Sequence, residues 1–512
     1  MKQIKILENE YWWGVNAGRG YKMPFDANTD ISFNMGDNPE GSDQYAPFLL
    51  SSKGRYVWSE KPFRTTFKDG TLTVETEYDV ELVEDCKTLK GAYLDAMKKH
   101  FPFNGKTPDK LFFTAPQYNT WMELGTGQTT EGILKYARSI VDNGLTPGVL
   151  MIDGGWQEQY GFYFTNARKV PDLKYLTDEL HKMGFKVMVW VSPIVGSAGH
   201  DYKQIRDKGY LIRNADGEIA IRKWWSGFSA VLDLTNPETV AWVHSEYKKL
   251  IEEYGVDGFK LDAGDQGFYR DDDRLYQPML AREHTYVFNE LGAPYPFNEY
   301  RAAYKFGGRE IVARLHDKHH TWDNPKNPGL NSLIPNTIMQ GLLGYAYCCP
   351  DMVGGGQIDT KSEVGIAGAI DEELFIRWTQ ANALMGMMQL SIGPWRILSK
   401  ESWEIVKKFT MLHKEYGEHF WALAQNAAKT GEPIVRSMEY QFPGNGYETI
   451  VDQFVLGDDI IVAPVVKKGQ FERDVKLPEG KWLSDEGKEY IGGTTITEKV
   501  PLDRLCFYKK IG

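Results

Sequence analysis

Two strand-like runs, GVLMID (148–153) and FKVMVWVSP (185–193), flank a helical pattern over 172–183. A second helical pattern, over 238–254, leads into a third run, VDGFKLDAG (256–264). Strands that alternate with helices pair in parallel, because the chain must cross over between them. These units therefore predict a parallel sheet covered by helices.

The same alternation continues on both sides of this region. QYNTWMEL (117–124) precedes a helical pattern over 130–143, and three later runs are REIVARLH (309–316), LGYAYCCPD (343–351) and MMQLSIGP (387–394). The fifth strand, expected near Tyr295–Asn298, has the weakest pattern. Seven or eight such units over roughly 300 residues favour a (β/α)8 TIM barrel, in an α/β fold, over an open sheet.

The flanks of the chain have β character. Arg64–Glu84 alternates apolar and polar residues around an Asp69–Gly70 turn, and FPFNGKTPDK (101–110) is typical of a linker. A long amphipathic helix is expected over 402–427, followed by strand-like segments with Gly and Pro between them. We expect an N-terminal β-sandwich-like domain over 1–110, the barrel over 111–428 and a C-terminal all-β, sandwich-like domain over 429–512.

Composition excludes several classes of partner. The net charge is -11 without a basic cluster, which argues against nucleic acid and anionic membranes, and no apolar run is long enough to span a bilayer. The four cysteines lack metal-ligand spacing and no nucleotide-binding glycine motif occurs, so we expect neither metal nor cofactor.

The start lacks a signal-peptide pattern, which predicts a cytoplasmic protein if the chain is complete and a periplasmic or secreted one if a signal was trimmed. The oligomeric state is not determined.

Acidic residues recur where the predicted strands end. One such acid is commonly a helix cap, but several carboxylates around one barrel rim repel each other and indicate a function. These positions are Glu123, Asp153, Asp262, Asp265, Asp323 and Asp351. The 15 Trp and 28 Tyr residues offer flat rings on which a sugar can stack. Acid pairs, aromatic rings and no cofactor motif favour glycosyl transfer through an oxocarbenium-like state. The alternative is a catalytically inactive carbohydrate-binding protein on the same barrel.

From about Phe112 to the C-terminus the motifs resemble glycoside hydrolase family 31. KLDAGD (260–265) is similar to its nucleophile strand, and VARLHDKHHTWDNPKN (312–327) is similar to its acid/base loop. CCPDMVGGG (348–356), GEPIVRSMEYQFP (431–443) and DQFVLGDDIIVAPVV (452–466) agree with the family's wording. The resemblance implies a retaining exo-α-glycosidase that acts on oligosaccharides or glycosides.

The resemblance also implies roles for individual residues. Asp262 would be the nucleophile and Asp323 the acid/base, with carboxyl groups about 5–5.5 Å apart. The loop lacks the glycine that the family has before this Asp, so Asp317 is the alternative acid. Substrate contacts are expected from Asp153, Trp156, Trp190, Lys260, Arg314, Trp322 and Asp351. A structural ion pair for Lys260, core packing for Trp156 and Trp190, and an Arg314–Asp351 salt bridge are the alternatives.

Two departures from the family pattern bear on the substrate. The second strand ends in IDGGW (152–156) instead of Asp–x–Asp, and the eighth ends in QLSIGPWRI (389–397) without the family's Phe–Phe–Arg–x–His. Both resemble the branch that contains α-galactosidases and the myogenesis-regulating glycosidase. We therefore expect an α-galactosidase, with α-glucosidase, α-xylosidase and α-N-acetylgalactosaminidase activities as alternatives.

Overall fold

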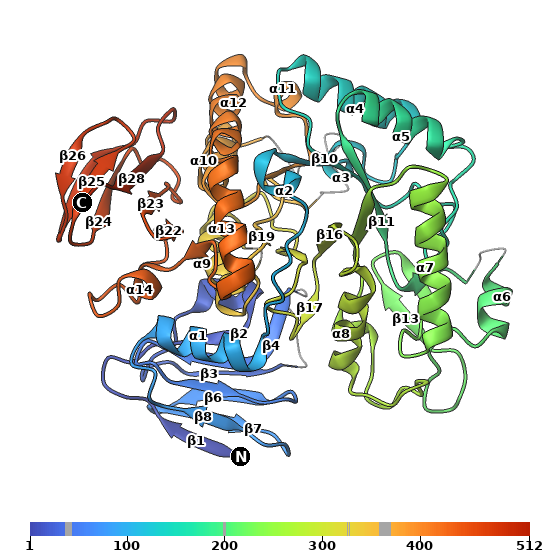
Figure 1. Ribbon diagram of the computed structural model, residues 1–512, viewed down its shortest axis with the longest axis horizontal. Coiled ribbons are helices and arrows are strands. Elements are labelled where there is room, and N and C mark those ends of the chain that lie inside the picture. Colours follow the sequence, from blue (N-terminus) through green and yellow to red (C-terminus); the bar gives the residue numbers. More distant parts are fainter. Residues whose placement is uncertain (36–42, 198–200, 325, 327, 358–369) are drawn as a thin grey trace.

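Eight parallel strands form a closed barrel at the centre of the molecule. The computed structural model describes residues 1–35, 43–197, 201–324, 326, 328–357 and 370–512 (Figure 1). Each barrel strand pairs with the next in chain order, the last pairs with the first, and a bridge between Met352 and Gln389 joins the seventh to the eighth. The strands are β9 (Gln117–Asn119), β10 (Val149–Ile152), β11 (Lys186–Val191), β15 (Gly258–Leu261), β16 (Phe297–Tyr300), β18 (Val312–Arg314), β19 (Cys348–Cys349) and β20 (Gln389–Leu390). The predicted (β/α)8 barrel is confirmed, and its fifth strand lies slightly later than expected.

The helices that cover the barrel begin where side chains cap them. Thr129, Asp172 and Asn236 each accept a hydrogen bond from a backbone N–H in the first turn of the helix that follows, which satisfies a donor that the helix leaves free. These helices, α4 (Thr130–Asp142), α5 (Leu173–Lys182) and α7 (Pro237–Glu252), agree with the three predicted patterns. Further barrel helices are α8 (Ala281–Gly292), α9 (Leu330–Leu342) and α10 (Glu372–Ala383).

The helix predicted over 402–427 is two helices. Helix α12 (Lys400–Glu415) ends at Tyr416, and α13 (Gly417–Thr430) begins directly after it. A Cβ at Gly417 would lie 2.7 Å from the Cα of Thr114, so this position brings the two backbones closer than any other residue would allow. Apolar periodicity runs through the break because both helices bury one face against the same core.

The N-terminal region contains two sheets, as its β character predicted. One sheet has the order β1 (Lys2–Lys5), β7 (Thr71–Glu75), β6 (Arg64–Lys68), β3 (Ile31–Asn34), and Asp69 and Gly70, both with positive φ, form the expected turn between β6 and β7. The other contains β2 (Trp12–Asn16), β4 (Gln44–Ser51), β5 (Tyr56–Trp58) and β8 (Glu81–Val83). Helix α1 (Leu89–His100) was not predicted.

A short strand that follows β16 joins the second N-terminal sheet. Strand β17 (Ala303–Tyr304) pairs in parallel with β4, with Ala303 opposite Gln44 and Tyr304 opposite Tyr45. The N-terminal sheet is therefore bonded to the chain just beyond the fifth barrel strand. The division into three domains at 110 and 428 stays our proposal.

The C-terminal strands form an all-β domain on the outer side of α10, α12 and α13 (Figure 1). Arg377 of α10 is fully buried and donates to the carbonyls of Val500 and Pro501, which docks the barrel onto this domain. The strands are β21 (Val435–Arg436), β22 (Phe454–Leu456), β23 (Ile460–Ala463), β24 (Glu472–Leu477), β25 (Lys481–Ser484), β26 (Glu489–Ile491), β27 (Thr494–Lys499) and β28 (Cys506–Lys510).

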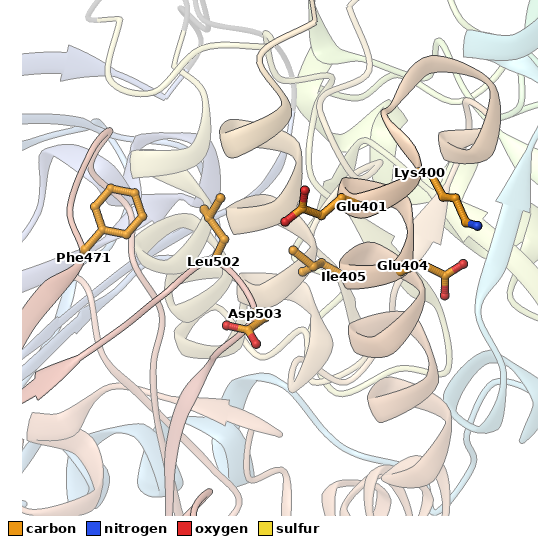
Figure 2. A pocket seen from close by; sticks show the side chains of 7 residues that line it. All are labelled: Lys400, Glu401, Glu404, Ile405, Phe471, Leu502 and Asp503. Carbon is orange, nitrogen blue, oxygen red and sulfur yellow. The ribbon is translucent and has the colours of Figure 1, made fainter.

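An open hollow of about 900 Å³ lies between α12 and the C-terminal domain. Figure 2 shows Phe471 and Leu502 facing Glu401 and Ile405 across it. None of the residues predicted for the site lines it, so it is not where the carboxylates meet. Within the described residues, no helix combines the length and apolarity needed to cross a bilayer.

Candidate active site

Asp262 directly follows β15 at the mouth of the barrel and is held by three donors. Arg301 Nε donates to its Oδ1 at 2.9 Å, Trp190 Nε1 to its Oδ2 at 3.0 Å, and the backbone N–H of Ala263 to Oδ1 at 2.9 Å. Burial opposes ionisation of this carboxyl, but Arg301, Lys260 and Arg314 outweigh it and hold the pKa of Asp262 well below its usual range. Asp262 is therefore an ionised carboxylate at neutral pH, as a nucleophile must be.

Arg301 directly follows β16 and bridges two acids. Besides Asp262, it binds Asp265 through Nη1 and Nη2 at 3.2 and 2.9 Å. Burial nevertheless raises the pKa of Asp265 to about 6, and the charge of Asp262 adds to this shift. The Arg301 guanidinium also lies 5.5 Å from the ring centre of Trp225, whose side chain is 57% exposed. Arg301 thus contacts both Asp262 and the exposed Trp225.

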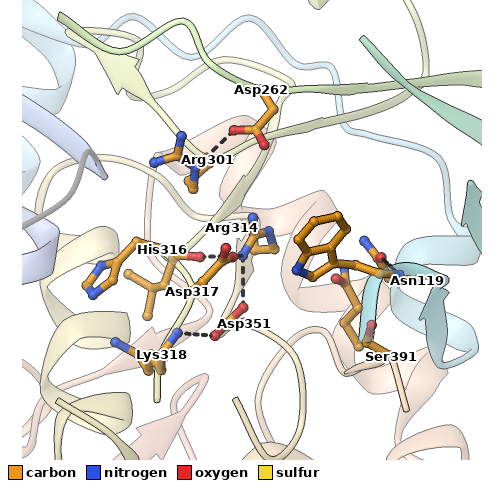
Figure 3. A network of polar contacts seen from close by, with 12 residues as sticks. Asn119, Asp262, Arg301, Arg314, His316, Asp317, Lys318, Asp351 and Ser391 are labelled. Atoms are coloured by element: carbon orange, nitrogen blue, oxygen red, sulfur yellow. Dashed lines mark hydrogen bonds and ion pairs between the residues drawn. The ribbon is translucent and has the colours of Figure 1, made fainter. Parts of the chain in front are cut away.

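Arg314 ends β18 and is the centre of a second cluster (Figure 3). Its Nη1 donates to Asp317 at 2.7 Å and to Asp351 at 2.8 Å, and its Nε lies 3.3 Å from Glu299. Arg314 and Asp351 are fully buried, whereas the Asp317 side chain is 31% exposed. The Arg314–Asp351 salt bridge given as an alternative is present, and Asp317 is the acid of this cluster that solvent reaches.

The two clusters act on each other electrostatically. Asp262 and Asp317 both raise the pKa of Arg301, and the same two acids raise the pKa of Arg314, although burial lowers both values. Each arginine therefore lies within the field of both carboxylates. Asp262 and Asp317 are 55 positions apart in the sequence. The folded chain brings both carboxylates into the field of Arg301 and Arg314.

Lys260 and Asp153 form the floor of the site. Lys260 Nζ donates to Asp153 Oδ2 at 2.5 Å, and both side chains are almost fully buried. The ion pair given as the alternative for Lys260 is present, with Asp153 as its partner, and the predicted sugar contacts of both residues stay predictions. Removing Asp153 alone would leave a buried ammonium unpaired, which costs about 3–5 kcal/mol.

The two predicted tryptophan walls differ in their surroundings. Trp190 places its indole N–H on Asp262, so its ring borders the nucleophile. Trp156 is completely buried and donates its indole N–H to the backbone carbonyl of Trp190 at 2.9 Å. A ring without exposed surface cannot stack on a sugar, so the geometry favours a supporting role for Trp156.

Asp323 is exposed on the loop that follows the sixth strand. Neither a hydrogen bond nor an ion pair of Asp323 is present among the residues that the structure describes. Its neighbour Trp322 donates its indole N–H to Asp371 at 3.0 Å, and Lys468 of the C-terminal domain binds the same carboxylate oxygen at 2.7 Å. Trp322 is therefore tied to the start of α10, and its predicted sugar contact stays a prediction.

The network contains more acid than base. Its six carboxyl groups (Asp153, Asp262, Asp265, Glu299, Asp317 and Asp351) face three cations (Lys260, Arg301 and Arg314). Burial raises the pKa of Asp351 to about 6 and raises that of Glu299, so protons can relieve part of the excess. A site that remains negative stabilises the positive charge that develops on a sugar ring during glycosyl transfer.

Two residues of the site have strained backbone conformations. Ala263, next to Asp262, has φ of 57°, and Asp351 has φ of 82°. Residues other than glycine rarely adopt such positive φ values. Such strain persists where surrounding contacts over-determine a position, and it occurs often at functional sites. Both positions turn the chain sharply at the end of a barrel strand.

Sequence reasoning missed Arg301 and left Trp225 unassigned. Arg301 stands in NEYRAAY (298–304), directly after the fifth strand, whose weak pattern hid the strand end. The Trp224–Trp225 doublet was visible, but nothing in the sequence separates the buried Trp224 from the exposed Trp225. Glu123, in contrast, is held by Arg396 and the backbone of Gly393, a structural contact at the rim.

Family models match most of the chain. The model described as "Glycosyl hydrolases family 31 TIM-barrel domain" matches residues 117–418, and "Glycosyl hydrolase family 31 C-terminal domain" matches residues 431–512. The chain belongs to glycoside hydrolase family 31. The resemblance inferred from KLDAGD and the C-terminal segments is thereby confirmed.

Individual relatives agree with this membership. The chain is 30% identical over 417 residues to the myogenesis-regulating glycosidase of Mus musculus, covering 80% of this chain and 57% of that protein. It is 23% identical to alpha-glucosidase 2 of Bacillus thermoamyloliquefaciens, over its whole length and 68% of the relative. The chain thus spans little more than half of the mouse relative.

A solved structure has the same fold. The family 31 dextranase of Flavobacterium johnsoniae superposes with a TM-score of 0.82 at 20% identity, covering 99% of this chain and 66% of that one. At 20% identity this similarity supports the fold alone, and it agrees with the (β/α)8 barrel described above.

The role of Arg301 predicts a pH effect. Arg301→Met removes the largest of the charges that offset burial, so the pKa of Asp262 rises and the acidic limb of the kcat/KM profile moves to higher pH. Arg301→Lys, which keeps the charge, should move that limb less. The measurement is kcat/KM for an aryl α-glycoside across the acidic range, and an unchanged limb in Arg301→Met would contradict the role.

Proposed function

We propose that this family 31 chain is a retaining exo-α-glycosidase. The observation that carries the proposal is Asp262, a carboxylate at the end of the fourth barrel strand that three cations and an indole N–H keep ionised. A retaining enzyme needs a carboxylate on one face of the sugar and a proton donor at the leaving oxygen. Similarity to the mouse glycosidase and the bacterial alpha-glucosidase supports the same chemistry.

In the proposed mechanism Asp262 attacks the anomeric carbon. The bond to the leaving oxygen breaks while the acid transfers its proton to that oxygen, which gives a β-linked glycosyl ester of Asp262 and a free alcohol. The acid, now a carboxylate, deprotonates a water that attacks the same carbon. The α-configured sugar is released, and both aspartates return to their starting protonation states.

We assign the acid/base role to Asp317 in place of Asp323. Asp317 is partly exposed and accepts a hydrogen bond from Arg314, and its charge and that of Asp262 both raise the pKa values of Arg301 and Arg314, whereas Asp323 has no described contact to either arginine. The side chain that delivers a proton to the leaving group must reach both the site and water. Asp323 remains the alternative, and the variants below separate the two.

For the glycone we propose α-galactose. The IDGGW ending of β10 leaves a single carboxylate, Asp153, which is paired with Lys260 on the floor of the site. An acceptor and a donor side by side suit a hydroxyl that points out of the mean plane of the sugar, as the axial 4-hydroxyl of galactose does. The exposed ring of Trp225 on Arg301 adds an apolar wall for the group beyond the cleaved bond.

The first test replaces the nucleophile. Asp262→Ala should abolish release of 4-nitrophenol from aryl α-glycosides, because no glycosyl ester can form. Azide should enter the vacated space and yield the β-glycosyl azide, and NMR of the early wild-type product should show the α-anomer. Turnover that persists in Asp262→Ala, or saturable binding with no turnover in the wild type, would instead support a carbohydrate-binding protein.

The second test separates the two candidate acids by leaving group. Phenyl glycosides need protonation to leave and 2,4-dinitrophenyl glycosides do not, so Asp317→Ala should lower kcat/KM about 10²–10⁴-fold on the former and little on the latter. Azide should then give the α-glycosyl azide. Asp323→Ala is the matched control and should resemble the wild type. The opposite pattern would return the role to Asp323.

The third test concerns the glycone. The aryl α-galactoside should exceed the α-glucoside, α-xyloside and α-N-acetylgalactosaminide by about ten- to hundredfold in kcat/KM, because a wrong epimer leaves a buried polar group unpaired. Asp153→Asn should remove most of that preference while keeping a partner for Lys260. A glucoside that equals the galactoside would overturn the glycone and leave the α-glycosidase intact.

A further inference from the structure

The backbone of the proposed acid is fixed on both sides by carboxylates from other parts of the chain. Before Asp317, the backbone N–H of His316 donates to Asp43 Oδ1 at 2.5 Å; after it, the backbone N–H of Lys318 donates to Asp351 Oδ2 at 2.7 Å. Asp43 and Asp351 are both fully buried. Asp351 belongs to the barrel, but Asp43 comes from the N-terminal region, 273 positions before His316.

Asp43 holds His316 by its side chain as well. The imidazole Nδ1 lies 2.5 Å from Asp43 Oδ2, so one carboxylate binds both the backbone and the ring of the residue that precedes Asp317. Such a two-point contact fixes the direction of the peptide as well as its position. The side chain of Asp317 leaves this fixed peptide toward Arg314. Figure 3 shows His316, Asp317 and Lys318 as consecutive side chains beside Arg314.

The next residue, Gln44, binds the ends of two barrel strands. Its Nε2 donates to the carbonyl of Arg301 at 2.6 Å and to that of Arg314 at 2.9 Å. Gln340 of α9 donates to Gln44 Oε1 at 2.7 Å, which fixes the orientation of the amide. Asp43 and Gln44 thus contact the backbones of Arg301, Arg314 and His316, which surround the two proposed catalytic aspartates.

The backbone of Gly18 borders the Asp43 carboxylate closely. A Cβ built on Gly18 would lie 2.2 Å from Asp43 Oδ2, so only glycine at position 18 lets the carboxylate adopt its place. Gly18 in turn is held by the Asn16 side chain, which accepts from its backbone N–H at 2.8 Å. The position of Asp43 is therefore set within the N-terminal region and transmitted to the barrel.

We propose that Asp43 is a positioning residue for proton transfer: through His316 it aims Asp317 at the leaving oxygen. This inference rests on the proposed function, in which Asp317 is the acid. Asp43 itself contacts neither substrate nor the reacting atoms. Its loss should therefore weaken acid catalysis selectively, while the attack by Asp262 remains intact.

Leaving-group dependence measures this selectivity. In Asp43→Ala, kcat/KM for the phenyl α-glycoside should fall about tenfold to hundredfold, while that for the 2,4-dinitrophenyl glycoside of the same sugar should fall by less than about threefold. Glu10→Gln is the matched control, because Glu10 is also a buried N-terminal carboxylate but binds Arg55 and Ser51. This control should leave both substrates unaffected.

Two milder variants keep the proposal testable if Asp43→Ala does not fold. Asp43→Asn retains the shape but loses the charge, and Gly18→Ala displaces the carboxylate without altering it. Both should reproduce the selective loss on the phenyl glycoside. Equal losses on the two substrates, or no loss on either, would overturn the positioning role.

The outcome also separates this proposal from the assignment of the acid. If Asp317→Ala shows the leaving-group pattern and the Asp43 variants do not, the positioning role fails and the function stands. If Asp317→Ala lacks that pattern, the acid assignment fails, and the role of Asp43 fails with it.

Discussion

The structure depends on the pairing of buried charges at the mouth of the barrel. Arg301 joins Asp262 to Asp265, Arg314 joins Glu299 to Asp317 and Asp351, and Lys260 binds Asp153. None of these acids could be buried alone, because an unpaired ionised group in the interior costs several kcal/mol. The two arginines therefore allow two and three acids, respectively, to lie close together. The remaining negative charge is available for a positively charged sugar ring.

This pairing requires that the backbones of the two arginines be held in place, and the N-terminal region contributes to holding them. Arginine side chains are long, and they place acids accurately only if their own backbones are fixed. Gln44 holds the carbonyls of Arg301 and Arg314, and β17 bonds the chain beyond Arg301 to strand β4. The N-terminal sheet is thus part of the frame of the site and not merely an appended domain.

The C-terminal domain contacts the start of helix α10, which in turn binds the loop that follows the sixth strand. Lys468 binds Asp371 at the start of α10, and Asp371 also accepts from Trp322 in the loop that follows the sixth strand. Arg377 on the same helix is buried against Val500 and Pro501. In the loop that follows the sixth strand, His316 is therefore held by Asp43 of the N-terminal region, and Trp322 is held by Asp371 of α10, which the C-terminal domain also binds. The loop depends on contacts from three parts of the chain.

The sequence by itself determined the barrel, the helices α4, α5 and α7, the β character of both flanks and the candidate nucleophile Asp262. The barrel, the helices and the flanks follow from periodicity and capping residues, and Asp262 follows from the resemblance of KLDAGD to the family's nucleophile strand. Tertiary structure alone decided which acids meet. Asp262 is hydrogen-bonded to Arg301 and Asp317 to Arg314, and Arg301 became visible only once β16 was placed beside β15. Asp43 and His316 are 273 positions apart, and no local pattern encodes a contact made across that separation, because it arises from packing the N-terminal region on the barrel.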